Sequence, residues 1–211
     1  MSIADAIVEI RQKITAAAQG RRVELVAVSK TVEAARVNEA RAAGQLVFGE
    51  NYAQELRDKA PLVKGAQWHF IGPLQRNKVK YVVGVASLVH GIDSLQLGME
   101  VASRAAKLGL VQPCLLQVNV ANEPQKSGCP TTELPALLEA LRAEPPLRID
   151  GLMCIPPAVG DPRPHFAALR ELATEHGLAE LSMGMSADYE AAIAEGATLV
   201  RVGSAIFGRR G

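Results

Sequence analysis

Short apolar runs alternate along the chain with longer segments in which apolar residues recur at helical spacing. Eight of the runs have the length of β-strands, and most are bounded by Gly, Pro or a capping residue. Several are apolar almost throughout, which is typical of strands covered on both faces. We therefore predict strands at residues 23–29, 45–49, 67–72, 87–92, 113–120, 148–155, 180–185 and 199–203.

The segments between these strands predict helices. The clearest spans residues 95–108, because Ser94 can cap its first turn and Gly109 can end its last. Another helix, at residues 2–19, precedes all the strands and carries four isoleucines at helical spacing. The remaining predicted helices span residues 32–43, 52–60, 75–83, 134–143, 163–176 and 187–195.

Eight alternations of strand and helix within 211 residues predict the fold class. They favour a single α/β domain, residues 1–211, folded as a (β/α)8 TIM-type barrel with an extra helix at its amino terminus. The alternative is an open, doubly wound parallel sheet, which usually contains fewer strands.

Composition and charge argue against several classes of function. Hydrophobic residues make up 48% of the chain and charged residues 21%, and the formal net charge is +1 with no long run of Lys or Arg. This balance disfavours a surface for nucleic acid or for an anionic membrane, and an aromatic content of 4% disfavours stacking on single-stranded bases. The three cysteines lack metal-ligand spacing, and no segment resembles a signal peptide or could span a bilayer. We expect a soluble, cytoplasmic protein without a metal site.

Chemically useful residues fall where the predicted strands end, and in a barrel these ends surround the reactive site. Lys30 closes the first strand, and Arg201 lies near the end of the last. A buried lysine near other cations loses its proton more readily, and the neutral amine can attack a carbonyl. Gly203-Ser204 and Ser186 can hold a phosphate through N–H groups and hydroxyls, although a plain turn and a helix cap would use the same residues. The combination suits an aldehyde that carries a phosphate.

Four polar residues at or after strand ends each have two interpretations. Arg201 lies among apolar neighbours, so a buried donor to a ligand's ring nitrogen suits it better than a surface ion pair. Because arginine keeps its own proton, it would leave that nitrogen unprotonated. Asn51 can hydrogen-bond a ligand hydroxyl or shape a turn. His69 fits a core histidine better than a proton shuttle, and Lys126 fits a solvated loop lysine better than an anion contact.

With these residues assembled, the chain resembles the pyridoxal-phosphate homeostasis proteins, a family similar to the isolated barrel domain of alanine racemase. The resemblance runs nearly end to end, through blocks that occur in one order. These are VAVSKT at 26–31, FGENY at 48–52, WHFIGPLQ at 68–75, QVNV at 117–120, KSG at 126–128, GLM at 151–153, LSMGMS at 181–186 and VRVGSAIFG at 200–208. The chain departs from the family at Val32, where a second lysine is frequent, and at Ser94, where an arginine is common.

The resemblance implies a cofactor, pyridoxal 5'-phosphate, and a role for each candidate residue. It implies that Lys30 forms the internal aldimine, that Arg201 faces the pyridine nitrogen, and that Asn51 lines the pocket near the ring. The phosphate would be held by Ser186, Gly203 and Ser204. An auxiliary role for a second amine is not expected, because Val32 occupies that position.

The resemblance further implies a protein that holds the cofactor in vitamin B6 and amino-acid homeostasis without catalytic turnover, with pyridoxal-phosphate-dependent apoenzymes as recipients. The alternative is a pyridoxal-phosphate-dependent amino-acid racemase. Alanine racemases, however, take a tyrosine from a second domain across a dimer interface, and we expect no such domain and a monomer here. An arginine-bound ring nitrogen is also a poor electron sink. A lysine aldolase acting on a phosphorylated sugar would need an acid/base pair, for which Glu50 is the only obvious candidate.

Overall fold

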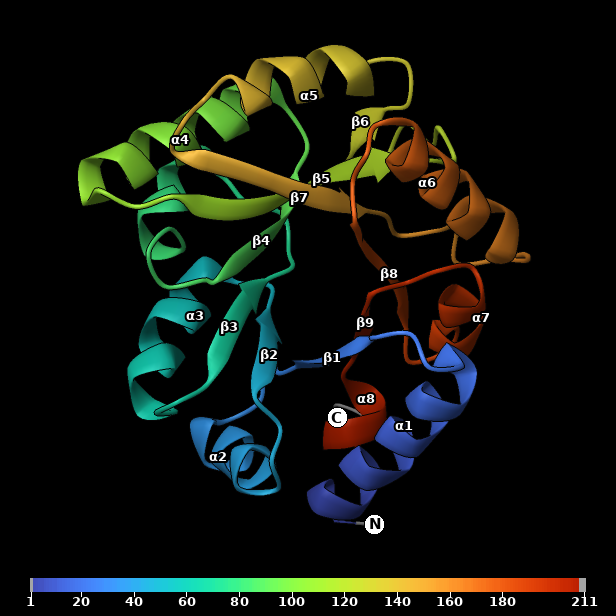
Figure 1. The fold of residues 1–211 in the computed structure, drawn as a ribbon. Helices are drawn as coiled ribbons and strands as arrows, with labels where there is room; N and C mark the ends of the chain where they lie inside the picture. The colour runs from blue at the N-terminus through green and yellow to red at the C-terminus, as the bar shows by residue number, and fades with distance from the viewer. Residues whose placement is uncertain (1, 209–211) are drawn as a thin grey trace.

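The computed structural model describes residues 2–208, and eight of their strands close into a parallel barrel surrounded by helices (Figure 1). Around the barrel the strands follow the order β1, β2, β3, β4, β5, β7, β8, β9, and the β4–β5 and β9–β1 pairings complete the ring. A closed ring has no free edges, unlike an open sheet, so the predicted TIM-type barrel is confirmed. The strands are β1 Glu24–Val28, β2 Val47–Glu50, β3 Gln67–Phe70, β4 Leu88–Ile92, β5 Gln112–Asn119, β7 Leu147–Met153, β8 Glu180–Met185 and β9 Leu199–Val202.

Helices cover the outside of the barrel (Figure 1). One of them, α4, has the bounds predicted from the sequence: the Ser94 hydroxyl accepts the Leu97 N–H, and Gly109, with a φ of 65°, ends the helix. The helices are α1 Ile3–Ala18, α2 Ala34–Ala42, α3 Ala53–Lys59, α4 Leu95–Leu108, α5 Leu134–Arg142, α6 Arg163–Glu175, α7 Tyr189–Ala194 and α8 Ser204–Phe207.

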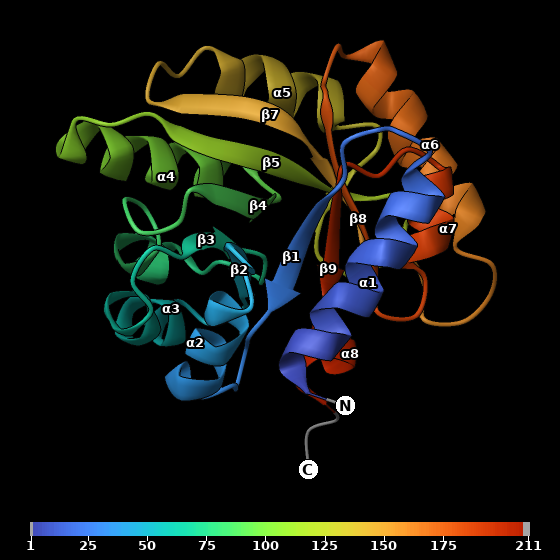
Figure 2. The same ribbon diagram turned by 60° about the horizontal axis from the view of Figure 1, so that its bottom comes forward.

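The amino-terminal helix α1 is the predicted addition to the eight β/α units. It opens with a capping box, in which the Ser2 hydroxyl accepts the Asp5 N–H and the Asp5 carboxylate accepts the Ser2 N–H. Its isoleucines are buried, and the helix lies beside α7 and α8 in both views (Figures 1 and 2). The helix therefore joins the outer layer of the barrel through its apolar face.

Four segments differ from the sequence-based expectation. Residues 75–83, predicted as a helix, form the 3-10 helix η2 Arg76–Tyr81, in which Val79 alone is buried and so provides little apolar surface for a longer helix. The helix predicted at 187–195 begins later, at α7, because the Asp188 carboxylate accepts the Met185 N–H at 2.6 Å and closes a turn there. Sequence patterns also did not indicate the 3-10 helix η1 Ala60–Leu62 or the short strand β6 Cys129–Pro130, which pairs with β5.

Side chains along each strand alternate between the barrel axis and the layer of helices. In β1, Leu25 and Ala27 pack beneath the helices, whereas Val26 and Val28 belong to the barrel interior. By the same alternation Lys30, two residues beyond Val28, faces the carboxyl-end mouth of the barrel. The buried apolar side chains of the interior are Val26, Val47, Ile71, Leu88, Leu115, Met153 and Leu199.

Candidate functional site

A cavity of about 340 Å³ lies at the carboxyl ends of the strands. This volume falls in the ordinary range for small-molecule sites, roughly 300–1,000 Å³. All six residues that the sequence singled out for a cofactor line it, namely Lys30, Asn51, Ser186, Arg201, Gly203 and Ser204. The remaining walls are Val28, Ile71, Ile155, Met185 and Ala187. Residues from β1 and β9 and from the segments after β2, β3, β7 and β8 thus meet at one place.

The backbone around Lys30 is held firmly, and the residue itself is half-buried. The next residue, Thr31, has a φ of 62°, a left-handed conformation that is uncommon outside glycine. Its N–H donates to the Glu55 carboxylate at 2.6 Å, and the Ser29 N–H donates to the Gly49 carbonyl at 2.9 Å. The lysine side chain therefore starts from a segment that is tied to β2 on one side and to α3 on the other.

Behind this segment lies a buried cluster of charges. The Lys59 ammonium donates to the Glu50 carboxylate at 2.7 Å and to the Ser29 carbonyl at 2.8 Å. It also donates to Glu55 at 2.8 Å, and the Ser29 hydroxyl donates to Glu50 at 2.7 Å. Burial raises the pKa of Glu50 above its ordinary value, although the hydrogen bonds from Lys59 and Ser29 oppose the rise. Glu50 is thus committed to this cluster, and it is not among the residues that line the Lys30 cavity.

Lys59 is a functional candidate that sequence reasoning missed. It lies on α3 three residues after Leu56 and six after Ala53, so the three side chains share one face of the helix, and all three are buried. A lysine at helical spacing with apolar residues was the available signal. The carboxylates that accept its bonds could not be identified from that spacing.

Arg201 is buried, with 4% of its surface exposed, which excludes the surface ion pair considered as an alternative. Its Nη1 donates to Ser182 Oγ at 2.6 Å and its Nη2 donates to the Cys154 carbonyl at 3.0 Å. Within residues 2–208 no carboxylate forms an ion pair with it. Burial lowers the pKa of Arg201, but an arginine stays protonated. A buried cation with no ion-pair partner among the described residues fits an electron-rich or anionic ligand, because an unpaired buried charge is costly.

Ser186, Gly203 and Ser204 come together beside Lys30. Ser186 does not cap α7, whose N-cap residue is Asp188; its hydroxyl instead accepts the Gly203 N–H at 3.3 Å. A Cβ at Gly203 would lie 3.1 Å from Val28, so a glycine lets β9 pass close to β1 here. The two hydroxyls and the adjacent backbone form a small polar corner suited to phosphate oxygens.

A second cavity of about 280 Å³ adjoins the first and shares Asn51, Ile71 and Ile155 with it. The Asn51 Oδ1 atom is buried and has no hydrogen-bond partner among residues 2–208, which leaves it available to a ligand. Lys126 lines the second cavity, where its ammonium donates to the Pro156 carbonyl at 2.9 Å and pairs with Glu123. Lys126 is therefore neither a plain solvated lysine nor part of the Lys30 cavity.

His69 is a core histidine, as predicted: it is 8% exposed, and its Nδ1 lies 3.0 Å from His90 Nε2. Burial lowers the pKa of His69 from 6.5 to about 4, and it lowers the pKa of His90 in the same direction. Both rings are therefore neutral near pH 7. His69 does not line the Lys30 cavity, so it cannot pass a proton directly to a ligand there.

The depressed pKa of His69 predicts a loss of stability in acid. Between pH 6.5 and about 4 the unfolded chain binds a proton at this residue while the folded chain does not, so the free energy of unfolding falls as pH falls. The full effect is about 3 kcal/mol. Urea unfolding of wild type and His69→Gln across this range should show a shallower fall in the free energy of unfolding for the variant. Parallel curves for the two proteins would contradict the prediction.

The three cysteines are buried and unpaired, and burial raises the pKa of Cys129 to about 11 and that of Cys154 to about 12. They are therefore inert thiols rather than nucleophiles. Across residues 2–208, no group of three or more His, Cys, Asp or Glu side chains is arranged to hold a metal ion. In the same part of the chain, no helix has the length and apolar character needed to cross a membrane.

Comparison with known proteins identifies relatives over almost the whole chain. Residues 4–211 match the family model of the alanine racemase N-terminal domain. The pyridoxal phosphate homeostasis protein of Pseudomonas aeruginosa is 47% identical over 99% of this chain and 96% of its own length. The protein of the same name from Escherichia coli is 42% identical over 99% of this chain and 97% of its own.

Solved structures agree with the sequence comparison. PipY from Synechococcus elongatus, in its structure with PLP bound, superimposes with a TM-score of 0.88 at 35% identity, over 98% of this chain and 100% of PipY. Alanine racemase from Corynebacterium glutamicum shares the fold, with a TM-score of 0.72 at 18% identity, over 98% of this chain and 61% of the racemase. The chain therefore belongs to the family of pyridoxal phosphate homeostasis proteins, which share the barrel of the alanine racemase N-terminal domain.

Proposed function

We propose that this protein binds pyridoxal 5'-phosphate through a Schiff base on Lys30 and acts in vitamin B6 and amino-acid homeostasis without catalytic turnover. The observation that carries the proposal is the convergence of all six candidate residues on one cavity at the barrel mouth. The names of its relatives and the PLP-bound structure of PipY support the same ligand.

The residues present suit each part of this cofactor. Lys30 supplies the amine for its aldehyde. Arg201, a buried cation without a carboxylate partner among residues 2–208, would donate to the ring nitrogen, and Asn51 would use its unpartnered oxygen beside the ring. Ser186, Gly203 and Ser204 would hold the phosphate. When bound, the cofactor supplies a reactive carbonyl and an electron-accepting ring.

The cavity favours a carrier over a racemase. Racemisation needs an acid or base on each face of the substrate carbon. The chain has three tyrosines, Tyr52, Tyr81 and Tyr189, and none of them lines the Lys30 cavity. Arg201 keeps its proton, so the ring nitrogen that it meets stays unprotonated and withdraws electrons weakly. The amine of Lys30 is thus placed for capture of the cofactor, and within residues 2–208 no tyrosine lines the cavity beside it for turnover.

An aldolase is disfavoured by the position of Glu50. This carboxylate was the obvious acid/base candidate, but it is fully buried behind the Lys30 segment and bonded to Lys59 and Ser29. A group held there cannot exchange a proton with a substrate in the cavity.

We also propose that the protein is a monomer and that pyridoxal-phosphate-dependent apoenzymes receive its cofactor.

A transfer experiment tests the proposed function. The protein is loaded with pyridoxal phosphate, freed of excess cofactor by gel filtration and mixed with the apo form of a transaminase. We expect transaminase activity to return with time, and we expect the protein alone to produce no D-alanine from L-alanine. If the protein loses the cofactor during gel filtration, the carrier proposal is wrong. Sustained formation of D-alanine would establish the racemase instead.

A further inference from the structure

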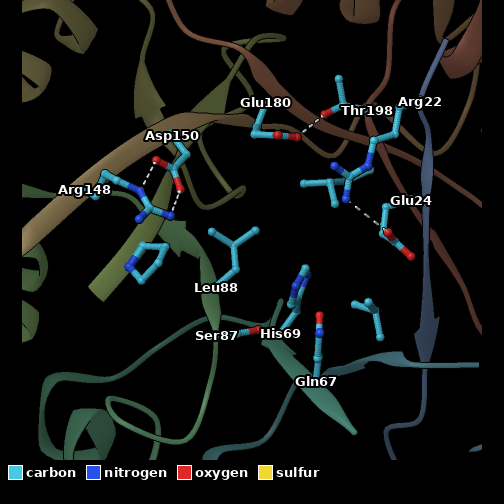
Figure 3. Close-up of a pocket in the computed structure, with 13 residues that line it drawn as sticks. Arg22, Glu24, Gln67, His69, Ser87, Leu88, Arg148, Asp150, Glu180 and Thr198 are labelled. Atoms are coloured by element: carbon cyan, nitrogen blue, oxygen red, sulfur yellow. Dashed lines mark hydrogen bonds and ion pairs between the residues drawn. The ribbon is translucent and has the colours of Figure 1, made fainter. Parts of the chain in front are cut away.

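A continuous chain of hydrogen bonds runs through the barrel interior, from the cofactor cavity to a cavity at the opposite mouth. Arg201 Nη1 lies 2.6 Å from Ser182 Oγ, which lies 2.8 Å from His90 Nδ1. His90 Nε2 lies 3.0 Å from His69 Nδ1. Arg201 lines the cavity at the carboxyl ends of the strands, and His69 lines the one at their amino ends (Figure 3).

The charged side chains around the amino-end cavity form ion pairs or hydrogen bonds with neighbouring side chains. Arg148 donates to Asp150 at 2.7 Å, and the Thr198 hydroxyl donates to Glu180 at 2.6 Å (Figure 3). His69 lies on the other side of the cavity from these pairs, near Ser87 and Gln67 (Figure 3), and its ring contacts His90 in the barrel interior. The chain of hydrogen bonds ends here, at His69. Its opposite end is Arg201, which lines the Lys30 cavity, so we expect the chain to act on the ligand through Arg201.

The donors in the chain point in one direction. A guanidinium only donates, so Ser182 Oγ accepts from Arg201 and can give its own hydrogen to His90 Nδ1. A neutral imidazole has one donor and one acceptor, so His90 Nε2–H then donates to His69. Both rings are neutral because burial lowers their pKa. The reverse direction would leave the Ser182 hydroxyl without an acceptor among residues 2–208.

We propose that Ser182 and His90 are positioning residues that hold the Arg201 guanidinium toward the ring nitrogen of the bound cofactor. This inference rests on the proposed function. Arg201 donates to Ser182 and to the Cys154 carbonyl from different nitrogens, and these two hydrogen bonds fix the plane of the guanidinium. His90 orients the Ser182 hydroxyl so that its oxygen lone pairs face Arg201. Loss of Ser182 leaves the Cys154 carbonyl as the anchor of the guanidinium, and loss of His90 lets the Ser182 hydroxyl turn away from its orientation toward Arg201.

The test uses the full-length protein loaded with pyridoxal phosphate that carries ¹⁵N in the ring. The nitrogen chemical shift reports the hydrogen bond from Arg201, and a merely structural role of Ser182 would not change it. In Ser182→Ala we expect this shift to move toward the value of Arg201→Gln, with a cofactor dissociation constant about tenfold higher, in line with the loss of a hydrogen bond to a charged group. Ser182→Thr, which keeps the hydroxyl, should restore both.

Two further variants complete the design. His90→Leu should move the nitrogen shift in the same direction as Ser182→Ala, and it replaces that variant if the alanine protein does not fold. Thr198→Val removes a barrel hydroxyl that takes no part in the hydrogen bonds from Arg201 to His69, and it should keep the wild-type nitrogen shift and cofactor affinity. A folded Ser182→Ala or His90→Leu protein with the wild-type nitrogen shift and affinity overturns the inference. Absence of bound cofactor in wild type would instead overturn the proposed function.

Discussion

Replacement of Lys30 by alanine is expected to abolish covalent attachment of pyridoxal phosphate. Lys30 faces the barrel mouth from a fixed backbone, and within residues 2–208 it is the one lysine that lines the cavity at the carboxyl ends of the strands. After loading and reduction with borohydride, wild type should carry the mass of one reduced cofactor on the peptide that contains Lys30. Under the same conditions Lys30→Ala should carry none, and its visible absorbance from the bound cofactor should disappear.

The control for this experiment is Lys126→Ala. Lys126 lines the adjoining cavity, and its ammonium is bonded to the Pro156 carbonyl and to Glu123, so its removal should leave the adduct on Lys30. Circular dichroism of both variants checks that each is folded. An adduct located on another side chain in the wild-type protein, or undiminished trapping in Lys30→Ala, would contradict the assignment of Lys30.

The second large effect is expected at Lys59, whose replacement by methionine should destabilise the fold by roughly 3–5 kcal/mol. The cause is the Glu50 carboxylate, which is fully buried and would lose its cation. Lys59→Met should also weaken cofactor retention, because Lys59 holds the Ser29 carbonyl directly before Lys30. Urea denaturation measures the first effect and equilibrium titration with pyridoxal phosphate the second.

A matched control and a rescue make this prediction specific. Lys13 pairs with Glu9 at 2.6 Å, close to the 2.7 Å of Lys59 and Glu50, but both Lys13 and Glu9 are exposed. Lys13→Met should therefore leave the midpoint of urea unfolding close to that of wild type. The double variant Glu50→Gln/Lys59→Met removes the stranded carboxylate and should recover much of the stability. If Lys59→Met lowers the free energy of unfolding no more than Lys13→Met does, the buried pair contributes little to stability.

The loss in Lys59→Met should also depend on pH. Without its cation, Glu50 has a pKa raised further above 4.5 in the folded state, while the pKa in the unfolded state is unchanged. The folded variant then binds a proton more tightly than the unfolded one, so its stability rises as pH falls through the raised pKa. The deficit relative to wild type is therefore largest near neutral pH and smaller in mild acid.

The elements of this fold were largely predictable because they depend on local chemistry. The capping residue before α4 and the glycine after it set bounds that the structure reproduces, and the spaced isoleucines of α1 face inward as expected. Local patterns failed where a distant or irregular contact decided the conformation. The start of α7 depends on the turn closed by Asp188, and β6 exists through its pairing with β5.

The barrel, the residues at which its strands end and the six residues that meet at one mouth could all be predicted from sequence, because each parallel strand that follows a helix returns its carboxyl end to the same side. The polar groups behind those six residues became known from the folded structure alone. Lys59 meets Glu50 from a neighbouring helix, and Arg201 meets Ser182 and, through it, His90 across the barrel. These contacts join residues 9, 19 and 92 positions apart on different elements, and no local spacing encodes which buried polar groups will satisfy one another once the barrel closes.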